Sequence, residues 1–211
     1  MNRKKWFVDL CLLFVKLTGA IPALLFLKPR VIREHKGALP RPCIVVPNHK
    51  SLMDFVLYLM VFPFRSIRFL MAEVLFNKGK FFGGFLRAIG GIRVDRDSRE
   101  FSFVADSLEV LEKGGTVGVF PEGRLPIQGK PFPFTPSTAF IALRAPEVPI
   151  VPVYTNGNYG LLKRAGVVIG KPLILAEYMQ EGLSEQEQLK HLTEVLRQKV
   201  YDLATKLEKE K

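Results

Sequence analysis

The chain has 211 residues, which is enough for one domain with a sizeable core and too few for two domains of ordinary size. The formal net charge of +11 indicates an acidic partner, which could be nucleic acid, anionic lipid headgroups or a phosphorylated substrate, and it does not choose among them. The two cysteines, Cys11 and Cys43, have no paired spacing and no neighbouring histidines, so neither a disulfide framework nor a metal site is predicted.

The N-terminal segment, residues 6–27, is mostly apolar and nearly long enough to cross a bilayer, which takes roughly 20 such residues. Lys5, Asp9 and Lys16 interrupt it at spacings of four and seven, which place them on one face of a helix. Basic residues flank the segment at both ends, where anionic headgroups would be. We therefore expect residues 1–30 to be a hydrophobic, helical membrane-anchoring segment that lies in the interface at the cytoplasmic face of the cell membrane. A single span and a core helix with one exposed edge are the alternatives.

Phenylalanine is over-represented, with 17 residues against a single tryptophan. In residues 76–89 several phenylalanines lie among lysines and arginines, a composition that suits a lipid headgroup boundary. A core helix with snorkelling basic side chains fits this segment equally well.

Residues 31–211 alternate strand-like apolar runs with helix-like segments, which predicts one α/β domain. Strands are predicted at 43–46, 67–71, 90–96, 116–120, 148–154 and 166–172, and helices at 51–64, 100–112, 137–144 and 184–207. Pro149 and Pro152 predict either that their strand lies at an edge of the sheet or that the prolines lie at a strand end, because proline has no N–H to donate. Ser184 and Glu187 form a capping box that begins the last helix.

A histidine follows the first strand of this domain, and an aspartate follows the histidine by five residues. On an unbroken helix, residues five apart point about 140° from each other, so His49 and Asp54 can meet only if His49 precedes the first helical turn. Asp54 would then hold one ring nitrogen and leave the other free as a base. A capped helix with a surface histidine is the alternative interpretation of this motif alone.

Two further polar loops follow apolar strands, Asp95-Arg96 and Glu122-Gly123-Arg124. Ligands in α/β sheets gather where strand ends meet loops, so the three loops are expected to converge on one cleft. A base beside guanidinium groups suits a substrate that carries both a hydroxyl to deprotonate and a phosphate to bind.

Four blocks of the chain, between about residues 39 and 172, resemble the glycerolipid acyltransferase family, in particular the 1-acylglycerol-3-phosphate acyltransferases. The blocks are Asn48-His49-x-Ser51-x-x-Asp54, Gly90-Gly91-Ile92-x-Val94-Asp95-Arg96, Phe120-Pro121-Glu122-Gly123-Arg124 and Val148-Pro149-Ile150-Val151-Pro152-Val153. The resemblance implies a mixed central β-sheet flanked by helices, preceded by a helical membrane-binding segment. Residues 31–211 would be the acyltransferase domain.

The resemblance also implies a reaction, in which a fatty acyl group passes from an acyl thioester to the free hydroxyl of a lysophospholipid. The acceptor would be 1-acylglycerol-3-phosphate and the product phosphatidic acid. His49 would deprotonate the hydroxyl and Asp54 would orient His49. Acyl-carrier protein or acyl-CoA would be the donor substrate, and no cofactor is expected. The chain has no Gly-x-Ser-x-Gly elbow for an acyl-enzyme.

By the same resemblance, Arg96 would hold the acceptor phosphate, while Glu122 and Gly123 would shape the acceptor loop. Backbone N–H groups near Ser51, at the start of a helix, are candidate donors to the oxyanion formed at the thioester carbonyl.

The chain departs from the family pattern on the acceptor side. The family usually reads Glu-Gly-Thr-Arg in the third block, so either Arg124 does the work of the family arginine from one position earlier or that contact is lost. Thr135 stands where the family usually has a lysine. An acyltransferase for another lysolipid and a non-catalytic lipid-binding protein therefore stay as alternatives. Nucleic-acid binding is not expected, because the basic residues do not cluster with aromatic residues in a recognisable module.

Overall fold

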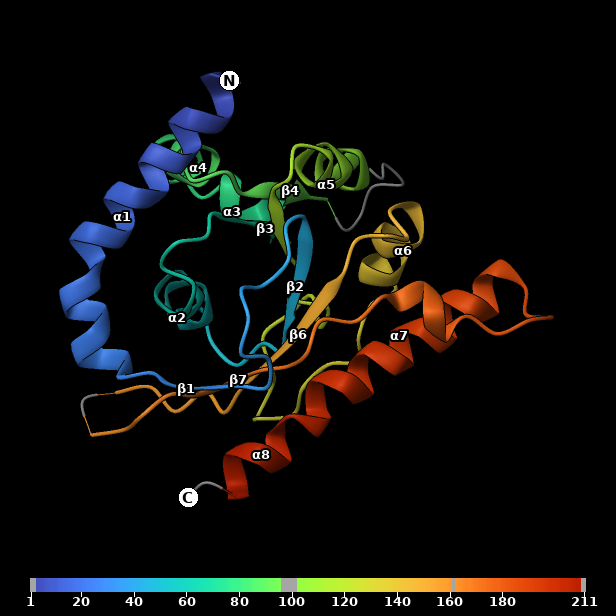
Figure 1. Cartoon of the computed structure of the whole chain (residues 1–211). Coiled ribbons are helices and arrows are strands. Elements are labelled where there is room, and N and C mark those ends of the chain that lie inside the picture. The colour runs from blue at the N-terminus through green and yellow to red at the C-terminus, as the bar shows by residue number, and fades with distance from the viewer. Residues whose placement is uncertain (1–2, 96–101, 161, 210–211) are drawn as a thin grey trace.

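The computed structural model describes residues 3–95, 102–160 and 162–209, and the strands among them form one seven-stranded sheet (Figure 1). The strands are β1 (Arg30–Arg33), β2 (Cys43–Pro47), β3 (Ile67–Ala72), β4 (Ile92–Val94), β5 (Thr116–Gly118), β6 (Ile150–Thr155) and β7 (Gly166–Ile169). Their order across the sheet is β1-β7-β6-β2-β5-β3-β4. The β6–β7 pair is antiparallel and the other neighbours are parallel, so the predicted mixed central sheet is confirmed.

Helices cover both faces of the sheet, with α1 and α2 on one side and α5, α6 and α7 on the other (Figure 1). The α-helices are α1 (Arg3–Leu27), α2 (Met53–Val61), α3 (Glu73–Phe76), α4 (Lys80–Ala88), α5 (Ser102–Glu112), α6 (Ser137–Arg144), α7 (Glu185–Asp202) and α8 (Ala204–Lys209), and a 3-10 helix, η1, spans Leu175–Tyr178. Strand β2 explains why both faces need cover, since successive side chains of a strand point to opposite faces. Ile44 and Val46 pack with α5, α6 and α7, whereas Cys43 and Val45 pack with α2.

Of the two placements predicted for the prolines, the sheet edge is wrong, because β6 lies between β7 and β2, whereas a strand end is confirmed for Pro149, which immediately precedes β6. The Gly170 N–H donates to the Pro152 carbonyl at 2.9 Å, and Gly170 lies just past the end of β7. The missing N–H of Pro152 therefore falls beyond the last pair of the β6–β7 ladder. Pro149 precedes β6, and its carbonyl still accepts from the Ile44 N–H at 3.0 Å. A proline can thus lie in a strand inside the sheet at a position where the neighbouring strand has already ended.

Further elements differ from the sequence prediction, among them β1 and the last helix. Strand β1 was not expected, because only two apolar residues lie between Arg30 and Arg33. The last helix was expected as one element, and Leu203 divides it into α7 and α8. The capping box is confirmed, since the Ser184 side chain accepts from the Glu187 N–H and the Glu187 side chain accepts from the Ser184 N–H.

Helix α1 turns Asp9 and Lys16 toward the protein body. The Asp9 carboxylate accepts a hydrogen bond from the Arg68 guanidinium at 2.9 Å. The Lys16 ammonium donates to three carbonyl oxygens at the end of α2 and in the turn that follows, at 2.8 to 2.9 Å, and burial lowers the pKa of Lys16 to about 8. Leu12 is buried between these contacts, against side chains of α2 and α4.

The opposite face of α1 is apolar and exposed. Its exposed side chains include Trp6, Phe7, Leu10, Leu13, Phe14 and Leu17. The polar residues are thus used to dock the helix, and the apolar residues face outward, which is the reverse of an ordinary surface helix. Among the helices in the described residues, none combines the length and apolar character needed to cross a membrane.

Candidate active site

The site is built on the turn between β2 and α2, where His49 lies before the helix and Asp54 lies in its first turn. His49 Nδ1 is 2.6 Å from Asp54 Oδ2, so the two side chains meet as the spacing predicted. The same oxygen accepts the backbone N–H groups of Lys50 and Ser51 at 2.6 and 2.8 Å. Asp54 is fully buried, and these donors compensate for the burial of its charge. The local chain therefore holds the carboxylate and the imidazole in one fixed arrangement.

The His49 ring is fixed from a second side by an aromatic contact. It stacks on Phe120, with ring centroids 4.3 Å apart, and its side chain is 16% exposed. Because Nδ1 faces Asp54, the other ring nitrogen, Nε2, is the one available to act as a base. His49 lines a cavity, so a substrate in this cavity can reach its ring.

Asn48 anchors the turn to the neighbouring strand. Its side-chain amide donates to the Thr155 carbonyl at 3.0 Å and accepts from the Thr155 N–H at 2.7 Å. Both residues are fully buried, so these two bonds satisfy polar groups that water cannot reach. Asn48 thus links the end of β2 to the end of β6. Asn48 is part of the sequence motif, but the sequence did not predict this contact.

Glu122 holds the backbone of the turn rather than its side chains. Its Oε1 accepts from the His49 N–H at 3.1 Å and from the Tyr201 hydroxyl at 3.0 Å, and burial raises the pKa of its carboxyl. Its Oε2 is buried with no hydrogen-bond partner in the described part of the chain. Gly123 has a φ of 63°, in the left-handed region that favours glycine, which explains glycine at this position. Tyr201 comes from α7 and was not anticipated from the sequence.

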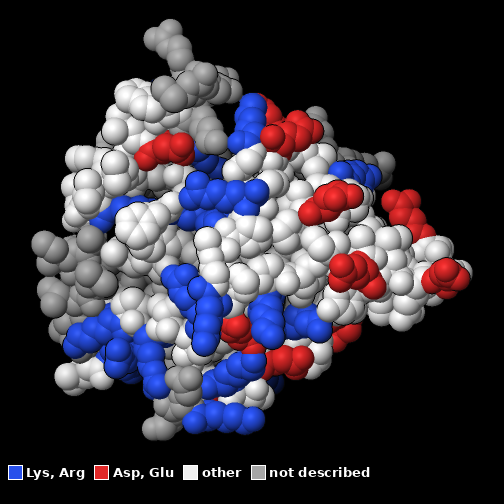
Figure 2. All heavy atoms as spheres, in the orientation of Figure 1, with Lys and Arg blue, Asp and Glu red and all other residues white. Residues whose placement is uncertain are grey.

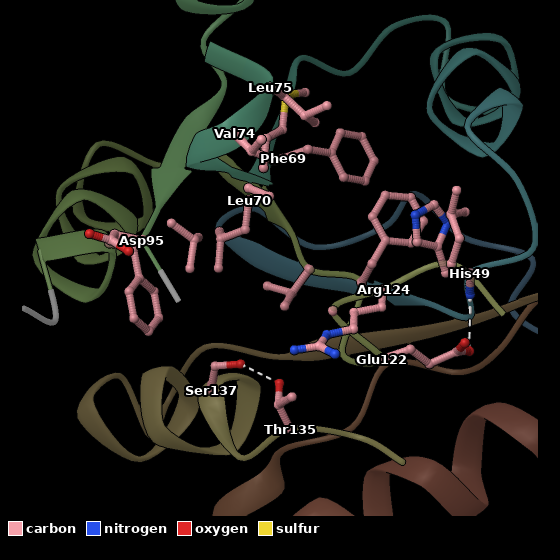
Figure 3. Close-up of a pocket in the computed structure, with 18 of the residues that line it drawn as sticks. His49, Phe69, Leu70, Val74, Leu75, Asp95, Glu122, Arg124, Thr135 and Ser137 are labelled. Atoms are coloured by element: carbon pink, nitrogen blue, oxygen red, sulfur yellow. Dashed lines mark hydrogen bonds between the residues drawn. The ribbon is translucent and has the colours of Figure 1, made fainter. Parts of the chain in front are cut away.

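A cavity of about 1040 Å³ extends from His49 along the sheet (Figure 3). Most of its wall is apolar, and the side chains include Phe69, Leu70, Val74, Leu75, Phe82 and Phe103. The polar groups in the wall are His49, Lys78, Asp95, Glu122, Arg124, Thr135 and Ser137. Figure 3 shows the labelled apolar residues on one side of the cavity and Arg124, Thr135 and Ser137 on the other. The shape and chemistry suit a ligand with a long apolar chain and a polar end.

The structure brings most of the predicted site residues to this cavity. Arg124 lines it, and its guanidinium carbon lies 5.9 Å from the centre of the Phe132 ring. Arg96 lies outside the described residues, so its expected contact with a phosphate stays a prediction. Asp95, which precedes Arg96, lines the cavity at the end remote from His49 (Figure 3).

The expectation that N–H groups near Ser51 stabilise an oxyanion stays a prediction, and the N–H groups of Lys50 and Ser51 have other partners. The Ser51 N–H donates to Asp54 Oδ2, as does the Lys50 N–H, and the Ser51 hydroxyl accepts from the Met53 N–H at 3.2 Å. The start of α2 is thus used to hold the aspartate.

No group of three or more metal-ligating side chains occurs among the residues that the structure describes.

The site combines a histidine held by a buried carboxylate with a cavity whose wall is mostly apolar. The family profile described as Acyltransferase matches residues 30–156, which is more than half of the chain. The chain therefore belongs to the acyltransferase family.

Relatives of known name extend this assignment. The chain is 27% identical over 195 residues to the 1-acyl-sn-glycerol-3-phosphate acyltransferase of Bacillus subtilis, a match that covers 90% of the chain and 96% of the relative. It is 32% identical over 129 residues to the 1-acyl-sn-glycerol-3-phosphate acyltransferase beta of Homo sapiens, covering 59% of the chain and 43% of the human protein. The crystal structure of the 1-acyl-sn-glycerophosphate (LPA) acyltransferase PlsC from Thermotoga maritima matches with a TM-score of 0.62 and 27% identity, over 95% of this chain and 81% of that one.

Replacing Asn48 with alanine should leave the N–H and carbonyl of Thr155 buried without partners. We expect the free energy of unfolding to fall by about 2 kcal/mol, measured by urea denaturation. Asn158→Ala is the matched control, because the Asn158 side chain is exposed, and it should change the value by less than about 0.5 kcal/mol. Equal effects of the two substitutions would contradict the anchoring role of Asn48.

Proposed function

We propose that the enzyme transfers a fatty acyl group from an acyl thioester to the free hydroxyl of a lysophospholipid, with 1-acylglycerol-3-phosphate as acceptor and phosphatidic acid as product. The observation that carries the proposal is the 2.6 Å contact between His49 Nδ1 and Asp54 Oδ2 in the wall of a large apolar cavity. The names of the relatives support the acceptor, since both curated relatives and the solved structure are acyltransferases for this lysolipid. Acyl-carrier protein or acyl-CoA would be the donor substrate.

His49 and Asp54 would support the proton transfers of such a reaction. His49 Nε2 takes the proton of the acceptor hydroxyl as its oxygen attacks the thioester carbonyl carbon, and the buried Asp54 carboxylate stabilises the imidazolium that forms. When the tetrahedral intermediate collapses, the carbon–sulfur bond breaks and the imidazolium proton passes to the leaving thiolate. The products are an ester and a free thiol, and His49 returns to its neutral form.

The cavity would bind the apolar and the charged parts of the acceptor at different parts of its wall. The apolar wall between α4 and α5 would hold an acyl chain, which removes its surface from water. Arg124 and Lys78 are the cations that line the cavity in the described residues, and a guanidinium or ammonium group is the usual protein partner of a phosphate.

A membrane-bound substrate would be reached through the exposed apolar faces of α1 and α4. Leu12 of α1 packs against Leu86 of α4, so the two helices lie against each other. On α4, Phe81 is 92% exposed while Phe82 lines the cavity, so one helix contributes to both the outer surface and the substrate site. We propose that this surface inserts into the interface at the cytoplasmic face of the membrane, with residues 1–30 as anchor and residues 31–211 as acyltransferase domain.

The charge distribution supports binding to acidic partners. Figure 2 shows lysine and arginine side chains over the left and lower parts of one face, whereas aspartate and glutamate lie mainly toward the right. With a net charge of +11, such a surface favours anionic headgroups and an acidic acyl donor.

Replacing His49 with alanine should remove the base and lower kcat by about 10³-fold while the circular dichroism spectrum stays unchanged. The assay measures thiol released from an acyl thioester, with a panel of lysolipid acceptors. His35→Ala, which removes an exposed histidine from a loop, should retain activity.

The panel also separates the alternatives. Thiol release with 1-acylglycerol-3-phosphate supports the proposal, and a strong preference for another lysolipid would replace only the acceptor. Binding of lysolipid without thiol release from any acceptor would indicate a non-catalytic lipid-binding protein and would overturn the proposal.

Replacing Arg124 with alanine tests whether it takes the place of the family arginine. We expect the acceptor KM to rise about tenfold with a smaller change in kcat, because a phosphate contact acts mainly on binding. Arg197→Ala is the control, since Arg197 lies on α7 and pairs with Glu194 outside the cavity. An unchanged acceptor KM would mean that the arginine contact of the family is lost in this chain.

The exposed face of α1 is tested by replacing Leu13, Phe14 and Leu17 with serine. Binding to vesicles that contain anionic phospholipid, measured by sedimentation, should weaken by about 100-fold because three large apolar side chains no longer enter the interface. The control replaces two exposed apolar residues before α7, Met179 and Leu183, with serine. Equal binding of both variants and the wild type would rule out α1 as the membrane-binding face.

A further inference from the structure

The loop between β6 and β7 places a tyrosine on the catalytic aspartate. The Tyr159 hydroxyl donates a hydrogen bond to Asp54 Oδ1, the oxygen that does not face His49. The two residues are 105 positions apart in the chain, and none of the sequence blocks that resemble the family includes Tyr159.

The two oxygens of Asp54 differ in what holds them. Oδ2 faces three groups, the His49 ring and the N–H groups of Lys50 and Ser51, all from the turn before α2. Oδ1 accepts from Tyr159. The terminal torsion of an aspartate is broad, so donors on one oxygen alone leave the carboxylate plane free to tilt. A donor on the second oxygen, from a different part of the fold, fixes that plane.

Burial and the neighbouring Asp54 charge raise the pKa of Tyr159 well above its usual value, so its hydroxyl keeps its proton and remains a donor. The ring packs against the apolar cluster on the α2 side of the sheet. The packing of the Tyr159 ring therefore keeps its hydroxyl directed at the Asp54 carboxylate.

The loop that carries Tyr159 is held by its own hydrogen bonds. The Gly160 N–H donates to the Phe26 carbonyl in the last turn of α1 at 3.2 Å. The Asn156 side chain accepts from the N–H groups of Asn158 and Gly166, both at 3.0 Å. These contacts do not involve the tyrosine hydroxyl, so removing that hydroxyl leaves the loop anchored.

We propose that Tyr159 is a positioning residue for the transfer reaction, whose hydroxyl holds the Asp54 carboxylate in the plane that keeps His49 Nδ1 engaged and Nε2 directed into the cavity. No proton passes to or from Tyr159 in this role. The proposal rests on the proposed function insofar as His49 is the base. Tyr159 acts through Asp54 and does not contact the substrate.

The test is Tyr159→Phe, which keeps the ring and removes the hydroxyl. We expect kcat to fall about tenfold while the acceptor KM changes less than about twofold, because the base is misoriented and the acceptor contacts are intact. Tyr178→Phe, in η1 and outside the cavity wall, is the matched control and should leave both constants unchanged. Unchanged kcat in Tyr159→Phe would overturn the proposal, as would a fall in kcat matched by an equal loss in Tyr178→Phe.

A second readout does not depend on turnover. A proton on His49 Nδ1 that is hydrogen-bonded to Asp54 should give a separate downfield signal in proton NMR spectra of the wild type. We expect this signal to shift or broaden in Tyr159→Phe and to stay in place in Tyr178→Phe. A signal unchanged in both variants would overturn the positioning role even if kcat falls. If the wild type releases no thiol with any lysolipid, the proposed function fails, and the NMR comparison still decides whether Tyr159 orients the pair.

Discussion

A buried carboxylate is the constraint on which the site depends. Asp54 is fully buried, and a buried charge costs several kcal/mol unless donors surround it. Its donors come from the His49 ring, from the turn before α2 and from the loop after β6. Satisfying this one group therefore requires β2, α2 and the β6–β7 loop to meet at a single point. The same requirement orients the His49 ring, so the stability of the turn and the orientation of the imidazole have a common cause.

The two faces of the sheet divide the work of the molecule. On one face α2 carries Asp54, and the last turn of α1 accepts a hydrogen bond from the loop that carries Tyr159. Helix α1 and the His49–Asp54 pair are thus joined by one loop. On the other face α5, α6 and α7 cover the core. Tyr201 of α7 donates a hydrogen bond from its hydroxyl to the Glu122 carboxylate. The cavity lies among α4, α5 and the loop after β5, within reach of both the base and the apolar surface.

The acceptor side of the cavity carries the features in which this chain departs from its family. Arg124 lies in the cavity wall one position earlier than the family arginine, so the shortened block still brings a cation to the site. Thr135 occupies the place of a usual lysine, and its hydroxyl lies 2.7 Å from the Ser137 hydroxyl and 3.0 Å from the Pro121 carbonyl. Two neutral hydroxyls therefore lie at this place in the cavity wall.

The sequence by itself determined the features that depend on neighbouring residues. The meeting of His49 and Asp54 follows from a strand end, a turn and a helix start within a few positions, and the alternation of apolar runs gave the α/β class. Only the tertiary structure decided which distant groups complete the site. Thr155, Tyr159 and Tyr201 contact it from 79 or more positions away, and no local pattern encodes such partners. The polar stripe of α1 was visible in the sequence, but its inward direction depends on Arg68 and on three carbonyl oxygens that only the folded chain brings beside it.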